Sequence, residues 1–142
     1  MRILVLNGPN LGRLGSREPD VYGSAGLDDV ERVVSSTGVE VDLRQTDSEA
    51  ELVRWIHEAV DTRTPVVLNP AAFTHYSYAL RDACAMVTTA GIALVEVHIT
   101  NPHARESFRH TSTISGVATG VIAGFGIDGY RLATLAILAR LA

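Results

Sequence analysis

Residues 2–10 read RILVLNGPN, an apolar run that stops abruptly at asparagine, glycine and proline. Its β-branched and leucine side chains follow one another without alternation, which is typical of a strand buried on both faces of a parallel sheet. Similar runs occur at residues 66–68 and 92–99. A shorter, more exposed strand is predicted at residues 39–43 and a glycine-diluted strand at residues 116–123. The chain is therefore expected to form five strands.

Helical patterns separate these strands. Residues 48–62 place apolar side chains on one stripe, and Glu51 follows Ser48 by three residues, as in a capping box. Further helices are predicted at about residues 27–36, 77–88 and 128–141. Strands that alternate with helices predict an α/β fold, and the length fits a single domain over residues 1–142. We therefore expect a flavodoxin-like three-layer sandwich with a five-stranded parallel sheet in the order 2-1-3-4-5.

The composition excludes several classes of function. A net charge of −4 without runs of like charge argues against nucleic acid and acidic membranes as partners. The chain has no apolar stretch of about 18 residues and no signal-like start, so we expect a cytoplasmic protein without a membrane span. One cysteine and five scattered histidines argue against a disulfide or a metal site. All 12 cationic residues are arginine, which excludes Schiff-base chemistry on a lysine.

Polar side chains gather after the predicted strands, at the edge where parallel sheets bind ligands. Arginines beside strand ends favour recognition of an anion, because guanidinium contacts carboxylate or phosphate at two points. Arg105 and Arg109 are four residues apart and would share a face if their segment were helical. The residues concerned are Asn7, Asn10, Asn69, Thr74, His75, His98, Ile99, Thr100, Asn101, Arg105 and Arg109.

Glu96 and His98 lie two residues apart on a predicted strand, so both point to the same face. A carboxylate beside a histidine can orient it as a general acid or base. The alternatives are that His98 only forms a hydrogen bond at the sheet edge and that Glu96 only caps a neighbouring loop.

The connection after the first strand, at about residues 11–24, is long for a loop and rich in glycine and proline. It lacks the glycine patterns that bind phosphate. We interpret it as either a plain surface loop or a flexible active-site lid that carries Arg17 and Tyr22. A non-catalytic module that binds a small anion would use the same loop and arginines. It would give no reason for Arg17, Tyr22, Glu96 and His98 to occur together.

Five blocks of sequence carry a resemblance to a known family. They are residues 6–23 (LNGPNLGRLGSREPDVYG), 47–57, 68–83, 96–112 (EVHITNPHARESFRHTS) and 124–133. With these blocks the chain resembles type II 3-dehydroquinate dehydratase from end to end. The resemblance implies an anti elimination of water from 3-dehydroquinate through an enolate, in the shikimate pathway or in quinate breakdown. It implies no metal, cofactor or covalent intermediate. It also implies a homo-oligomer, a dodecamer built from trimers. The helix predicted at residues 128–141 is apolar nearly all round, which fits contact with another subunit.

The resemblance also implies a role for each matching residue. Tyr22 matches the base on the lid, and Arg17 matches a lid arginine whose charge favours the phenolate. His98 matches the acid, with Glu96 beside it, and Asn10 matches a residue that stabilises the enolate oxygen. The expected substrate-binding residues are Asn69, His75, Asp82, Ile99, Thr100, Arg105 and Arg109, and Asp82 would reach into a neighbouring subunit's site.

Two of the matching positions depart from the family pattern. Ala71 stands where the family usually has glycine, which is expected to tighten the turn after Asn69. Thr100 replaces the usual serine and keeps its hydroxyl. Neither departure removes a catalytic group.

Overall fold

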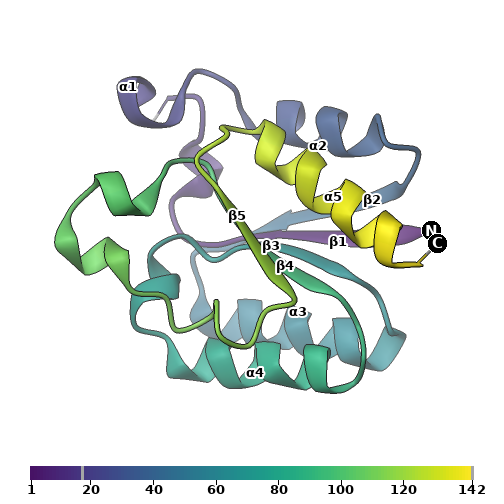
Figure 1. The fold of residues 1–142 in the computed structure, drawn as a ribbon. Coiled ribbons are helices and arrows are strands. Elements are labelled where there is room, and N and C mark those ends of the chain that lie inside the picture. Colours follow the sequence, from purple (N-terminus) through teal and green to yellow (C-terminus); the bar gives the residue numbers. More distant parts are fainter. Residues whose placement is uncertain (17, 142) are drawn as a thin grey trace.

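The structure is a computed structural model that describes residues 1–16 and 18–141. Five parallel strands form one sheet in the order β2-β1-β3-β4-β5, which confirms the predicted fold class and strand order. All five carboxyl ends therefore face the same edge (Figure 1). The strands are β1 (Arg2–Asn7), β2 (Glu40–Gln45), β3 (Val66–Asn69), β4 (Leu94–His98) and β5 (Gly120–Ala123).

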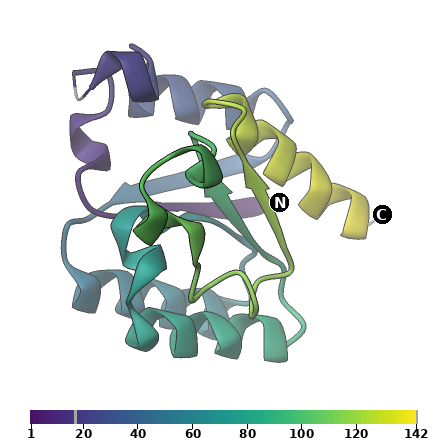
Figure 2. The same ribbon diagram turned by 60° about the vertical axis from the view of Figure 1, so that its left-hand side comes forward.

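Helices cover both faces of the sheet and complete three layers (Figures 1 and 2). On one face lie α2 (Leu27–Ser35) and α5 (Asp128–Leu141), and on the other α3 (Glu49–Thr62) and α4 (Tyr78–Thr89). These four helices agree with the predicted ones to within about a residue at each end. The carboxyl edge carries shorter elements: α1 (Pro19–Tyr22) and the 3-10 helices η1 (Leu11–Arg13), η2 (Ala71–His75), η3 (Pro102–Ala104) and η4 (Ser107–His110). No described helix has both the length and the apolar character to cross a membrane.

The sheet has a separate apolar core on each face. Leu4 and Leu6 of β1 point toward α3 and α4, whereas Ile3 and Val5 point toward α2 and α5, and all four side chains are fully buried. Alternate side chains enter opposite cores. A central strand covered on both faces therefore needs apolar residues throughout, which explains the unbroken run in β1.

Two strands begin later than the sequence pattern predicts. The fourth begins at Leu94, and the fifth at Gly120. Before the fifth strand, the amides of Val117 and Ala118 donate to the carbonyl of Ile114, at 2.9 and 3.1 Å. This turn uses the backbone donors that a longer strand would need. It makes residues 116–119 a connection between the edge loops and β5.

The loops after β1 and β3 touch at a glycine. A Cβ atom on Gly8 would lie 2.5 Å from the carbonyl oxygen of Pro70, so only glycine fits. The Gly8 amide donates to the carbonyl of Asn69 at 2.8 Å. This close approach brings Asn10 and the residues after β3 to one place at the carboxyl edge.

Candidate active site

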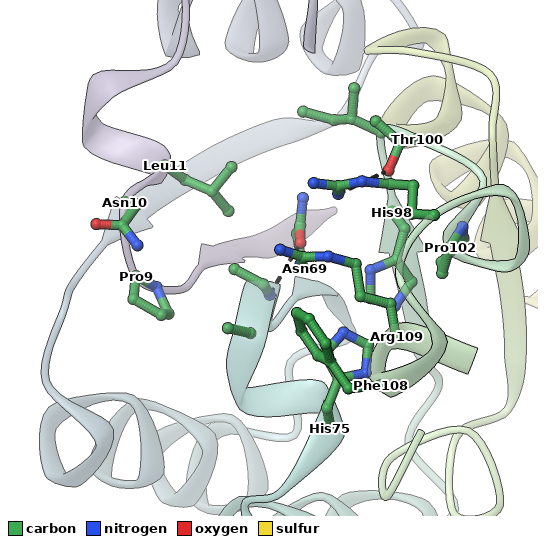
Figure 3. Close-up of a pocket in the computed structure, with 14 residues that line it drawn as sticks. Pro9, Asn10, Leu11, Asn69, His75, His98, Thr100, Pro102, Phe108 and Arg109 are labelled. Atoms are coloured by element: carbon green, nitrogen blue, oxygen red, sulfur yellow. Dashed lines mark hydrogen bonds between the residues drawn. The ribbon is translucent and has the colours of Figure 1, made fainter. Parts of the chain in front are cut away.

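A cavity of about 260 Å³ lies at the carboxyl edge of β1, β3 and β4 (Figure 3). Its volume is close to the lower end of the range of small-molecule sites, roughly 300 Å³. Residues from three strand ends and from η2 and η4 line it. Of the residues singled out in the sequence, those that line it are Asn10, Asn69, His75, His98, Ile99, Thr100, Arg105 and Arg109. Eight of the eleven residues predicted at this edge therefore line one cavity, whereas Asn7, Thr74 and Asn101 do not.

His98 and Glu96 form a buried pair at the end of β4. The Nε2 atom of His98 is hydrogen-bonded to Oε2 of Glu96, and Glu96 is only 1% exposed. Glu96 also accepts hydrogen bonds from the Ser112 and Ser115 hydroxyls. The carboxylate thus orients the histidine and fixes a neighbouring loop at once. Since Nε2 faces Glu96, Nδ1 is the nitrogen of His98 left for a ligand.

Asn69 is held by a series of buried hydrogen bonds between side chains. Its Nδ2 donates to the hydroxyl of Tyr130 at 2.9 Å, and that hydroxyl donates to Oδ1 of Asn7 at 2.7 Å. The Oδ1 of Asn69 accepts from the Ala71 amide at 3.1 Å. Burial raises the pKa of the Tyr130 phenol, against a smaller opposite effect of the Asn69 hydrogen bond, so this tyrosine stays neutral. Tyr130 was not predicted as a site residue, because its only signal in the sequence is a phenol within an apolar helix.

His75 is fixed by two contacts. Its Nδ1 is 2.8 Å from the carbonyl oxygen of Thr111, and its ring meets Phe108 edge-on at 5.9 Å between centroids. A carbonyl only accepts, so Nδ1 carries the hydrogen. In the neutral ring, Nε2 is then left as an acceptor for a ligand hydroxyl.

The two arginines reach the cavity from different short elements. The condition under which they would share a helix face is not met, because Arg105 is extended between η3 and η4 and Arg109 lies within η4. The Asn101 side chain accepts from the His103 amide and starts η3 with Pro102, and this first 3-10 helix ends before Arg105. The side chains of both arginines are 17% exposed, so they lie largely within the structure.

The charges around the cavity favour an anion. Arg105 donates to the Thr100 hydroxyl at 3.2 Å, and Arg109 lies over the Phe108 ring, 4.7 Å from its centroid. Glu106 contacts both arginines, at 3.8 and 3.2 Å, from an exposed position on the rim. Its own backbone hydrogen bond and then Arg109 hold the pKa of this carboxyl below its usual value. Two guanidinium groups thus face the cavity while their carboxylate partner faces outward.

The long connection after β1 begins in a fixed conformation. Asn10 has a φ of 69°, which asparagine adopts more readily than most residues, and its amide donates to Oδ1 of Asp47 at 2.9 Å. Leu11 and Leu14 are buried in the core next to α2. A Cβ on Gly15 would lie 3.1 Å from the carbonyl oxygen of Ser24, so the chain leaves and returns at nearly the same point.

The tip of this connection lies at the same sheet edge as the cavity. Helix α1, which ends at Tyr22, is drawn at the upper left of Figure 1, beside the carboxyl ends of the strands. Arg17, the other residue singled out here, lies outside the described residues.

Asp82 and Cys84 on α4 do not line the cavity. The Asp82 side chain is 73% exposed and pairs with Arg81 at 2.9 Å. Cys84 is fully buried, and burial raises the pKa of its thiol to about 12, so it is not a nucleophile. Among the described residues, no cluster of three or more histidine, cysteine or acidic side chains could hold a metal ion.

Comparison with known proteins identifies the family. The family model described as "Dehydroquinase class II" matches residues 1–138. A protein from Kineococcus radiotolerans named 3-dehydroquinate dehydratase is 62% identical over 137 residues, which cover 94% of this chain and 92% of that protein. A protein of the same name from Salinispora arenicola is 58% identical over 144 residues, covering 99% of both.

Solved structures agree with the sequence matches. The type II dehydroquinase from Propionibacterium acnes has a TM-score of 0.90 and 49% identity, covering 97% of this chain and 96% of that one. The type II dehydroquinase from Butyrivibrio crossotus has a TM-score of 0.90 and 41% identity, covering 97% of both. Sheet order, strand-edge cavity and these similarities lead to one conclusion: the chain belongs to the class II dehydroquinase family.

Proposed function

We propose that this chain catalyses the dehydration of 3-dehydroquinate to 3-dehydroshikimate. The observation that carries the proposal is the Glu96–His98 pair, which reaches a cavity with two guanidinium groups at the strand edge of a class II dehydroquinase. The similar proteins from K. radiotolerans and S. arenicola are both named for this reaction. The reaction needs a base for a carbon-bound proton, an acid for the leaving hydroxyl, and donors for the enolate oxygen.

The substrate carboxylate is proposed to bind at Arg105, Thr100 and the backbone of Ile99. Arg105 already reaches the Thr100 hydroxyl at 3.2 Å, so both can contact one carboxylate. A guanidinium group suits this role because it offers two parallel donors. The groups proposed to hold the ring hydroxyls are Asn69, His75 and Arg109.

Tyr22 is proposed as the base, and Arg17 as the cation that favours its phenolate. The other tyrosines support this assignment by elimination. Tyr130 is buried and neutral, while Tyr76 and Tyr78 are exposed and are not among the described residues that line the cavity. Residues 11–24 are proposed to form a lid that carries Tyr22 to the substrate.

In the proposed reaction Tyr22 removes a proton from the carbon next to the substrate carbonyl, and the electron pair moves onto the carbonyl oxygen. Asn10 stabilises the resulting enolate oxygen through an ordered water molecule. His98, charged and held by Glu96, then gives a proton to the hydroxyl as its C–O bond breaks. Water leaves and a carbon–carbon double bond forms next to the carbonyl. These steps use side chains and an ordered water molecule, without metal, cofactor or covalent intermediate.

The test is a continuous ultraviolet assay with 3-dehydroquinate, because the product has a conjugated double bond that the substrate lacks. We expect an absorbance rise that survives borohydride treatment, since a chain without lysine forms no Schiff base. His98→Ala is expected to lower kcat by about 10²–10⁴-fold. No rise from folded wild-type protein would overturn the proposal and favour a module that only binds a small anion.

The site is also proposed to be completed by assembly into a dodecamer built from trimers. In this assembly Asp82 would reach the cavity of a neighbouring copy. In support, Asp82 borders a shallow hollow on α4 together with Met86, which is 49% exposed. Tyr78 and Leu135 are further exposed large side chains, on α4 and α5. Light scattering is expected to give about twelve times the chain mass of 15.2 kDa. A fully active monomer would contradict this proposal.

A further inference from the structure

We infer that Ser112 and Ser115 are positioning residues, which hold Glu96 as an ionised acceptor and thereby fix His98 in one tautomer. The inference rests on the proposed function, in which His98 is the acid. Both serines follow η4 in the sequence and lie 16 and 19 residues after Glu96. Together with Glu96 and His98 they line a second cavity of about 280 Å³, which lies beside the first and shares His98 with it.

The direction of the Ser112 hydrogen bond follows from its neighbours. Its Oγ accepts from the amides of Ile114 and Ser115, both at 3.0 Å. These two bonds use both lone pairs of the hydroxyl oxygen. Its hydrogen therefore points to Glu96, whose two carboxylate oxygens are each 3.2 Å away.

Three donors converge on the buried carboxylate. Ser115 donates to Oε1 of Glu96 at 2.7 Å, Ser112 donates to both oxygens, and the His98 ring bonds to Oε2. A proton on Oε1 would displace a serine hydrogen, and a proton on Oε2 would require the His98 ring to accept instead of donate. The arrangement therefore favours the ionised carboxylate at a position that is only 1% exposed, where an unpaired charge would be costly.

The serines can fix Glu96 because their own backbone is fixed. Ile114, between them, is fully buried in the core beside α3 and α4. The amide and hydroxyl of Thr113 both donate to the carbonyl of Thr74, at 2.7 and 3.0 Å. Residues 112–115 are thus held against η2 and the core. Through the two serines this fixed backbone also fixes the position of Glu96 near the end of β4.

The consequence for the reaction concerns which nitrogen of His98 moves a proton. An ionised Glu96 accepts from Nε2–H, so Nε2 keeps its hydrogen throughout. The proton that reaches the leaving hydroxyl comes from Nδ1, on the side of the ring away from Glu96. Without the serines, Glu96 would be free to turn or to take a proton, and the charged imidazole would lose its partner.

The experiment compares Ser112→Ala and Ser115→Ala with wild type in the dehydration assay. We expect each to lower kcat about tenfold, part of the roughly 10²–10⁴-fold that a general acid contributes, with KM changed less than twofold. Ser107→Ala is the matched control, since this exposed serine in the preceding 3-10 helix does not contact Glu96. Ser115→Thr, which keeps the hydroxyl, is expected to recover most of the lost kcat.

A double-mutant cycle separates positioning from general damage. In a His98→Ala background the two serine substitutions should change kcat less than twofold, because they act through the missing ring. The same tenfold loss in both backgrounds would overturn the inference. If Ser112→Ala fails to fold, because it also loses two backbone contacts, Ser115→Ala alone decides.

A spectroscopic readout keeps the inference independent of turnover. In ¹⁵N NMR of the imidazole without substrate, wild-type His98 is expected to show a protonated Nε2, and the Ser112→Ala/Ser115→Ala double variant a mixture of tautomers. An unchanged His98 spectrum would overturn the inference. Absence of dehydration by wild type, together with the expected change in the spectrum, would instead overturn the proposed function alone.

Discussion

The two sides of the cavity differ in the sequence separation of the residues that their hydrogen bonds join. The strand-edge wall, formed by Asn69, His75, Glu96 and His98, is tied to distant parts of the chain: Asn69 bonds to Tyr130, 61 residues further on. The loop side, residues 8–26, has a fixed start, but the backbone hydrogen bonds described toward its tip are local. They join Ser16 to Arg13 and Val21 to Glu18.

This difference suits two separate tasks. Groups that stabilise developing charge act best when they are already oriented, because they need no rearrangement during the reaction. A segment that admits substrate and excludes water has to move, and such segments come from the less stable parts of a structure. In the proposed reaction the acid belongs to the wall and the base to the loop. The acid is therefore fixed in place, whereas the base reaches the substrate when the lid closes.

The largest expected effect is on the loop side. Tyr22→Phe removes the proposed base and should lower kcat by about 10²–10⁴-fold, and Arg17→Ala should cost at least about 100-fold, because the phenol would then be poorly ionised at neutral pH. Both variants should fold as wild type by circular dichroism, since none of the described side chains of residues 15–26 belongs to either apolar core. Near-normal turnover by either variant would contradict these assignments. Tyr76→Phe, on an exposed tyrosine that does not line the cavity, is the control.

The next largest effect is expected on the wall. Tyr130→Phe leaves Oδ1 of Asn7 without its donor and Nδ2 of Asn69 without its acceptor, both in a buried site. Unpaired buried polar groups cost about 1–3 kcal/mol each, so we expect the two together to lower the free energy of unfolding by at least about 2 kcal/mol. Urea titration at one protein concentration measures it. Tyr76→Phe, on an exposed side chain, should leave the midpoint unchanged.

A smaller effect is expected where the two sides join. Oδ1 of Asp47 accepts from the Asn10 amide at 2.9 Å and from Gln45 Nε2 at 3.0 Å, which fixes the start of the loop. Because this site is exposed, Asp47→Ala should cost about 1 kcal/mol, seen as a roughly fivefold lower kcat/KM. Asp47→Asn keeps an oxygen at this position and should lose less than twofold. Equal losses in the two variants would show that the charge matters and that the acceptor does not.

Most residues of the wall could be predicted from the sequence, because their positions depend on the strand to which each belongs and on where that strand ends. A period of two puts Glu96 and His98 on one face, and strands that stop at polar residues bring Asn69 and His75 to the same edge. The partners of these residues could not be predicted in this way. Tyr130, Ser112 and Ser115 meet them only after packing brings distant segments together, and no periodicity encodes that alignment.

The edge segment between β4 and β5 shows why local rules fail in places. Their spacing would put Arg105 and Arg109 on one face of a continuous helix, but Asn101 and Pro102 start a short 3-10 helix that ends before Arg105. Both arginines still reach the cavity, by a different route. The roles of Tyr22 and Arg17 stay predictions, since they depend on the family resemblance and on the experiments above.

The smallest predicted effect concerns a strained residue in the wall itself. Ala71 has a φ of 53°, in the left-handed region that costs an L-residue about 1–2 kcal/mol. Glycine avoids this cost but loses more entropy on folding, about 0.4–1 kcal/mol. We therefore expect Ala71→Gly to raise the free energy of unfolding by about 0.5 kcal/mol, measured by urea titration at one protein concentration.

The neighbouring residue supplies a matched control for that measurement. Ala72 lies in the same 3-10 helix and is not among the residues with positive φ. Ala72→Gly gains nothing from relief of strain and should lower the free energy of unfolding by about 0.5–1 kcal/mol. Opposite signs at adjacent alanines would show that the wall keeps a strained turn after Asn69. A loss at both positions would mean that the Ala71 methyl group contributes more through its packing against the core than its backbone conformation costs.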